Sequence, residues 1–202
     1  MKYSLLFVTI LIVSSCGDKK STSSEATAAP AAREAQNTEG YPPNSEILDY
    51  SDTPGLSKAT VKVAGNIHQE GDYMNDQRNG SWTEYHGNGV VKTITTYVNG
   101  KKQGIQIEMD NRGNLLSKNY YHNDAFDGEC LTFKRGKVIE RKNYQGGQLV
   151  GMVTKYYDTG KIMEESPYEG GQIHGTAKWY DKEGNVTLEY IYENGQFIRK
   201  VE

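Results

Sequence analysis

The sequence predicts an all-β fold: an elongated, twisted antiparallel β-meander built of tandem β-hairpins. Tyrosines and glycines recur every 23 or 24 residues, and turn-forming residue pairs recur with them. Periods of this size indicate an array of one repeated supersecondary unit. The tyrosines that share one register are Tyr73, Tyr97, Tyr121, Tyr144, Tyr168 and Tyr192. The glycines that open successive units are Gly80, Gly104, Gly128, Gly151 and Gly175.

One turn of each unit lies two and three residues after the tyrosine. Its residue pairs are Asn75-Asp76, Asn99-Gly100, Asn123-Asp124, Gly146-Gly147, Gly170-Gly171 and Asn194-Gly195. Glycine, asparagine and aspartate tolerate positive φ best, and a type I′ turn requires positive φ at both central residues. These pairs therefore predict two-residue hairpins with antiparallel flanking strands.

The other turn of each unit ends in a glycine of a second series. These turn glycines are Gly89, Gly113, Gly136, Gly160 and Gly184. Several of the loops begin with aspartate, as in Asp110 to Gly113, which is typical of type I turns closed by a left-handed glycine. A calcium loop is the alternative, but each loop offers only one or two carboxylates, so we expect no metal site.

The strand between the two turns carries an aliphatic residue, such as Val91, six residues before the tyrosine. Because this spacing is even, we expect the aliphatic and tyrosine rows to share one face of the sheet. A position filled identically in every unit suits packing between neighbouring units, so we interpret the six tyrosines as packing rather than ligand-binding residues.

The N-terminus has the layout of an export signal. Residues 1–15 contain Lys2 and an apolar core from Leu5 to Val13, too short to span a bilayer. The following Cys16 ends a stretch that resembles the lipobox of bacterial lipoproteins, which implies lipidation of Cys16 and a membrane anchor outside the cytoplasm. Gly17 in place of aspartate favours the outer membrane. The alternative is an ordinary secretory signal with an incidental cysteine.

The mature chain divides into a tether and a repeat domain. Residues 16–52 are rich in Ser, Thr, Ala, Glu and Pro, so we expect a disordered, lipid-anchored linker. Residues 53–202 hold about six units and contain 19 basic and 19 acidic residues. Such formal neutrality weighs against nucleic acid as a partner. Cys130 has no cysteine partner within the domain, and we expect it to be a small buried filler.

The repeated unit, from Gly80 through Tyr85, Gly89, Val91 and Tyr97 to the Asn-Gly turn, resembles the MORN repeat. It is most similar to the variant found in bacterial YwqK-type antitoxins. The resemblance covers about residues 56–198 and implies an array of β-hairpins in an elongated, twisted sheet. It also implies a binding function and, for the antitoxin branch, neutralisation of a toxin.

Enzyme chemistry finds no support in the sequence, and no cofactor is expected. The four histidines occupy four different repeat positions, and none lies at a motif spacing from a nucleophile. We therefore expect a non-enzymatic scaffold that binds a protein or an envelope polymer. Aromatic residues outside the tyrosine register and one histidine are the candidate contacts: Trp82, His122, Phe126 and Trp179. The alternatives are an immunity lipoprotein against an envelope-delivered toxin, and membrane association by the repeats.

Overall fold

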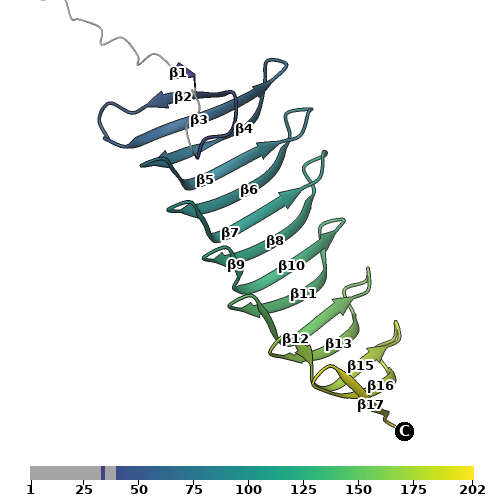
Figure 1. Cartoon of the computed structure of the whole chain (residues 1–202). Helices are drawn as coiled ribbons and strands as arrows, with labels where there is room; N and C mark the ends of the chain where they lie inside the picture. Colours follow the sequence, from purple (N-terminus) through teal and green to yellow (C-terminus); the bar gives the residue numbers. More distant parts are fainter. Residues whose placement is uncertain (1–32, 35–39) are drawn as a thin grey trace, which may run out of the picture.

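The structure is a computed structural model that describes residues 33–34 and 40–202. These residues contain strands and turns and no helix, and all the strands belong to one sheet. Every pairing is antiparallel and joins strands that are near neighbours along the chain (Figure 1). The all-β fold class predicted from the sequence is confirmed.

The strands follow one another as hairpins. Their bounds are β1 (Arg33–Glu34), β2 (Ser45–Asp49), β3 (Leu56–Val63), β4 (Asn66–Met74), β5 (Gln77–Tyr85), β6 (Val91–Val98), β7 (Lys101–Met109), β8 (Leu115–His122), β9 (Ala125–Phe126), β10 (Gly128–Lys134), β11 (Lys137–Gln145), β12 (Gln148–Tyr156), β13 (Ile162–Glu169), β14 (Gln172–Ile173), β15 (Gly175–Tyr180), β16 (Val186–Glu193) and β17 (Gln196–Lys200). The short strands β9 and β14 lie just before β10 and β15 and pair with the same neighbours, β8 and β13.

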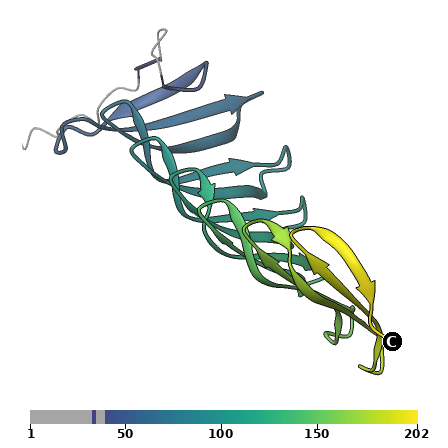
Figure 2. The same ribbon diagram turned by 60° about the horizontal axis from the view of Figure 1, so that its bottom comes forward.

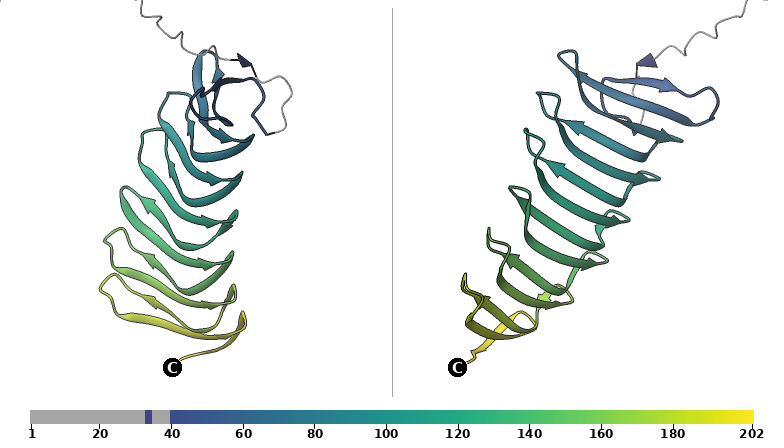
Figure 3. Two further views of the ribbon diagram at one scale, coloured as in Figure 1. Left: turned by 90° about the vertical axis from the view of Figure 1, so that its left-hand side faces the viewer. Right: turned by 180° about the vertical axis from the view of Figure 1, so that it is seen from behind.

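The sheet is long, twisted and bowed. The hairpins succeed one another along a single axis from β2 to β17, and the two ends of the array lie far apart (Figures 1 and 2). Seen from the side, each hairpin is curved, so that the stacked units form an open trough (Figure 3). An antiparallel meander of this length has to twist because each strand twists in the right-handed sense.

The ordered sheet starts earlier than expected. Strand β2 pairs along its whole length with β3, and Tyr41 packs against Tyr73 with 4.1 Å between ring centroids. Residues 40–52 therefore belong to the folded array, and the boundary expected at residue 53 is wrong. The signal segment 1–15, Cys16 and most of the expected linker lie outside the described residues. Within the described part, no helix has the length and apolarity to cross a membrane.

The type I′ turns are confirmed by the backbone. Both central residues have positive φ in all six turns, for example 49° at Asn99 and 78° at Gly100. These turns also fasten each unit to the preceding one. The amide of Gly100 donates to the carbonyl of Arg78 at 2.9 Å, and the amide of Gly147 donates to that of Phe126 at 2.8 Å. The same bond recurs at Asp124, Gly171 and Gly195, so it forms a ladder along one edge of the array.

The turns at the opposite edge follow the prediction in four units. Gly89, Gly113, Gly160 and Gly184 have φ between 81° and 99°, and each amide donates back to the carbonyl three residues earlier. The turn at Gly136 is different, because Arg135 also has positive φ, at 52°. This unit is one residue shorter than the others between Gly128 and Gly136, and the deletion converts the predicted type I turn into a two-residue type I′ turn.

The expectation that the aliphatic and tyrosine rows share a face is wrong. Thr95, two residues before Tyr97, pairs with Trp82, whereas Val91 pairs with Tyr85. Trp82 and Tyr85 lie three residues apart in β5 and so point to opposite faces. The cause is a β-bulge, which places one extra residue after Val91. The same register shift recurs in the corresponding pairings of the other units.

We call the side that carries the six tyrosines the tyrosine face, and the side that carries Val91 and Tyr85 the aliphatic face. The core lies on the tyrosine face. Its largest cluster comprises Ile47, Ala59, Tyr73 and Trp82, all at most 3% exposed. Three of the later units contribute a small buried residue at the position of Trp82, namely Cys130, Val153 and Ala177. These residues are buried although no second layer of described residues covers the sheet, so we infer that the tyrosine face is the hollow side of the trough.

Candidate binding face

The tyrosine row is a mixed column rather than a stack of tyrosines alone. Each tyrosine pairs across the hairpin with the residue five positions later, which lies between it and the tyrosine of the next unit. The pairs are Tyr73 with Arg78, Tyr97 with Lys102, Tyr121 with Phe126, Tyr144 with Leu149, Tyr168 with Ile173 and Tyr192 with Phe197. The inserted residue is cationic in the first two pairs and apolar in the last four.

Cations are inserted between aromatic rings in the N-terminal half. The guanidinium of Arg78 lies 4.4 Å from the centroid of the Trp82 ring and 5.4 Å from that of Tyr97, and it donates to the Tyr97 hydroxyl at 3.3 Å. The ammonium of Lys102 lies 4.8 Å from the ring centroid of Tyr121. Cation–π contacts of this kind hold the charge against the sheet.

The C-terminal half of the row is apolar. Phe126 lies between two register tyrosines, with ring centroids 4.7 Å from Tyr121 and 5.1 Å from Tyr144. At the far end, Phe197 contacts Tyr192 at 5.9 Å and Tyr190 at 5.2 Å. The trough therefore changes character along its length, from basic and aromatic to apolar and aromatic.

The first register tyrosine, Tyr73, is fully buried. Its hydroxyl donates to the carbonyl of Gly40 at 2.7 Å, and burial is the main cause that raises the pKa of this phenol. The other five register tyrosines are half-buried, so their rings line the trough. Tyr73 closes the N-terminal end of the row, while the remaining tyrosines are accessible from the hollow side.

One of the four predicted contact residues is buried in the core, and a second belongs to the tyrosine row. Trp82 is 3% exposed, and its indole Nε1 donates to the carbonyl of Asp72 at 3.1 Å, so it cannot anchor a partner. Phe126 belongs to the tyrosine row itself rather than standing outside it. The prediction of Trp82 as a contact residue is wrong, whereas Phe126 is half-buried within the row and stays a predicted contact. A comparison of the positions 24 residues apart would have placed Trp82 in the core column, together with Cys130.

The other two predicted contacts are accessible. Trp179 is half-buried on the tyrosine face, with its ring 5.4 Å from Tyr190. His122 is exposed at the turn edge, where the side-chain amide of Gln103 donates to its Nδ1 at 3.0 Å. The two residues lie in different units, so the structure does not bring them together.

A second row of the tyrosine face carries charge. Glutamates recur along it at positions 84, 108, 140 and 164, and the pairing of the strands places them in line. Two of them form ion pairs with lysines: Glu140 with Lys142 at 2.6 Å, and Glu164 with Lys155 at 2.9 Å.

The neighbouring Cys130 is buried, and burial raises the pKa of its thiol. This thiol is therefore a packing group and a poor nucleophile.

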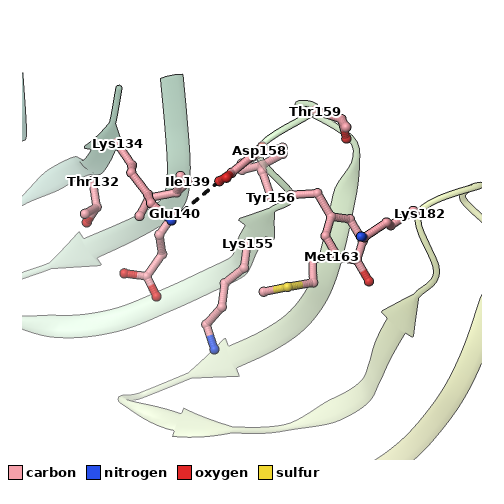
Figure 4. A pocket seen from close by; sticks show the side chains of 11 residues that line it. Thr132, Lys134, Ile139, Glu140, Lys155, Tyr156, Asp158, Thr159, Met163 and Lys182 are labelled. Atoms are coloured by element: carbon pink, nitrogen blue, oxygen red, sulfur yellow. Dashed lines mark ion pairs between the residues drawn. The ribbon is translucent and has the colours of Figure 1, made fainter. Parts of the chain in front are cut away.

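A groove of about 610 Å³ opens on the tyrosine face near the turn at residues 157–160 (Figure 4). Ile139 of β11 and Met163 of β13 form part of its lining, and both are the extra residues of β-bulges. Lysines and carboxylates surround it. They are Lys134, Lys155, Lys182, Glu140 and Asp158. Sequence reasoning missed this groove because the bulges that turn Ile139 and Met163 toward the trough were not predicted.

The aliphatic face carries ionisable groups with structural partners. The hydroxyl of Tyr180 donates to Glu165 at 2.6 Å, which raises the pKa of the phenol to about 12. A similar bond joins Tyr85 to Glu70, and Lys58 pairs with the same carboxylate at 2.7 Å. Among the described residues, no group of three or more His, Cys, Asp or Glu side chains is arranged to hold a metal ion.

The fold and its trough define a class of protein, the β-hairpin repeat arrays. Comparison with known families adds the type of repeat. The family described as the MORN repeat variant matches residues 78–99, 149–169 and 173–194. Each match runs through one hairpin of the array, so three of the hairpins are similar to the MORN repeat variant. No curated protein matches the chain.

Proposed function

We propose that this chain is a non-enzymatic scaffold, held at the cell envelope by a lipid on Cys16, that binds a protein along its trough. The observation that supports this proposal is the continuous tyrosine face, which presents half-buried aromatic side chains in successive units. Aromatic residues that are already packed on one side lose little conformational entropy when a partner covers the other side. Repeat arrays commonly use such an extended concave surface for binding.

The binding proposal is tested by placing a photo-crosslinking amino acid on each face of the full chain. On the tyrosine face, Lys102 is a suitable position because its side chain lies over the row without being buried. On the aliphatic face, Val186 is the matched control because it is 45% exposed. Under our proposal, a defined crosslinked protein forms in cells from Lys102 and not from Val186. Equal products from both faces, or none from Lys102, would contradict the proposal.

The anchor is tested separately. Cys16→Ser removes the thiol that a lipid would occupy, and the matched control is Cys130→Ser, which leaves Cys16 intact. We expect the unchanged chain and the control to incorporate labelled palmitate and to sediment with membranes, while Cys16→Ser does neither. If Cys16→Ser remains membrane-bound, the anchor lies elsewhere and the envelope assignment needs another basis. An outer-membrane location would follow from density-gradient separation of the two membranes.

The second candidate function is an immunity lipoprotein that neutralises a toxin delivered to the envelope. The resemblance of the repeats to YwqK-type antitoxins favours it. A cytoplasmic toxin is out of reach of a protein anchored outside the inner membrane, so the toxin has to act in the envelope. The test is co-expression with the product of a neighbouring gene. Growth arrest by that product, relieved by the full chain and not by Cys16→Ser, would support immunity.

A further inference from the structure

The groove on the tyrosine face crosses three successive units. Its lining runs from Thr132 and Ile139 in one unit, through Lys155 and Met163 in the next, to Lys182 in the turn of the third. Units repeat along the sheet at about 9.5 Å, the spacing of two strands. A ligand that fills the groove would therefore lie along the axis of the array rather than along one strand, which favours a linear molecule.

The floor of the groove is apolar because of which residues occupy the bulges. Three consecutive units place an apolar residue at this bulge, namely Leu116, Ile139 and Met163, and the last two line the groove. The units on either side place polar residues at the equivalent bulges, Lys92 and Thr187. The apolar floor is thus confined to one stretch of the trough. The groove has a volume of about 610 Å³, which falls within the range of small-molecule sites.

The rim of the groove carries an excess of positive charge. Three lysines and two carboxylates line it, and both carboxylates have lysine partners: Asp158 lies 3.7 Å from Lys134, and Glu140 lies 2.6 Å from Lys142. Lys155 is paired with Glu164. Lys182 is exposed and has no ion-pair partner among residues 40–202. One cation at the edge of an apolar floor is the arrangement that would hold a single anionic group.

We propose that this groove binds a small linear aliphatic carboxylate, with its chain on Ile139 and Met163 and its carboxylate beside Lys182. A peptide suits the groove less well, because the strands of the floor use their backbone groups in the sheet and offer mainly side chains. An aliphatic chain needs no hydrogen bonds, and its single charge matches the single unpaired cation. Carboxylate binding at this site needs no protein partner, although the groove lies on the same tyrosine face that we propose for protein binding.

The test is isothermal titration of the full chain with octanoate, decanoate and dodecanoate below their micellar concentrations. The chain carries Cys16→Ser, so that no attached acyl chain competes for the groove. A fully buried methylene adds about 0.8 kcal/mol, so a half-open groove should strengthen binding about fourfold for each two carbons. Dodecyltrimethylammonium, which has the same chain and the opposite charge, should bind at least tenfold more weakly than dodecanoate.

Two variants locate the site. Met163→Thr copies the residue that Thr187 places at the equivalent bulge, so the fold tolerates it, and we expect about tenfold weaker binding of dodecanoate. Lys182→Gln should weaken binding about threefold to fivefold, the size expected of an exposed ion pair. Lys200→Gln, exposed in β17 and outside the groove, is the control and should change nothing. Absence of carboxylate binding, or affinities unchanged in both groove variants, would overturn the proposal.

Discussion

Replacing Gly71 by alanine would drive a methyl group into the indole of Trp82. A Cβ at residue 71 would lie 2.5 Å from three atoms of that indole, well inside van der Waals contact. The indole has little room to move, because it is buried, donates to the carbonyl of Asp72, and packs edge-on against Tyr73 at 5.3 Å. Overpacking costs about 1–3 kcal/mol, and loss of the hydrogen bond about 1 kcal/mol more. We expect Gly71→Ala to lower the free energy of unfolding by about 3 kcal/mol.

The next unit supplies the matched rescue. Thr95 and Gln106 hold the same two positions 24 residues later, and the Gln106 side-chain amide donates to the Thr95 hydroxyl at 2.9 Å. Gly71→Thr and Trp82→Gln should each cost about 3 kcal/mol alone, the first by overpacking and the second by leaving a cavity. Together they recreate the pair of the next unit, so the double variant should cost about 4 kcal/mol.

Urea unfolding followed by far-ultraviolet circular dichroism gives all four free energies of this double-mutant cycle. The expected coupling between positions 71 and 82 is about 2 kcal/mol in favour of the double variant. If the two single losses simply add to within about 0.5 kcal/mol, or if Gly71→Ala is neutral, then the contact between glycine and indole does not determine the packing of this unit. Circular dichroism is preferred to fluorescence because one variant removes a tryptophan.

Three further outcomes are expected. The hydrogen bond from Lys58 holds the pKa of Glu70 below its usual value, so stability from this pair is present above the ordinary carboxyl pKa of about 4.3. This stabilisation is lost as the pH falls through the folded-state pKa of Glu70. Urea midpoints measured from pH 6 to pH 3 should therefore fall less steeply in Glu70→Gln than in the unchanged chain. Gly100→Ala should lower the free energy of unfolding in urea by about 1–2 kcal/mol, because φ at this position is 78°. Gly87→Ala is the control and should leave it unchanged, because Gly87 lies at an open position without positive φ. Cys130 should resist iodoacetamide in the native protein and react after unfolding, as read by peptide mass spectrometry; rapid native labelling would refute its burial.

The period and the turns could be predicted because their causes are local. A pair such as Asn99-Gly100 adopts positive φ with little help from the rest of the fold, and its repetition fixes the hairpin and the antiparallel pairing. The same reasoning failed at Gly136, since a deletion of one residue changes which turn closes the strands. Arginine at position 135 gives no sign in sequence that it will adopt φ of 52°.

The two faces could not be predicted, because a β-bulge reverses the side-chain alternation on which face assignment rests. The bulge after Val91 separates the aliphatic row from Tyr97, although the spacing of six residues suggests a shared face. The groove was missed for the same reason. The early start of the sheet had a weak signal, since Ser45 and Ile47 alternate with the exposed Glu46 in β2. The polar composition of the surrounding residues predicts a disordered linker instead of a strand.

The ladder of turn amides described above ties each unit to the one before it and to nothing more distant. Length is therefore an adjustable property of this architecture. After duplication or deletion of one unit of about 24 residues, the same hydrogen bonds between neighbouring units would form again, and the cross-section of the trough would not change. The length of the sheet would change in steps of about 1 nm, the spacing of two strands. Gene duplication within such a chain can thus fit the scaffold to a longer or shorter partner without redesigning any unit.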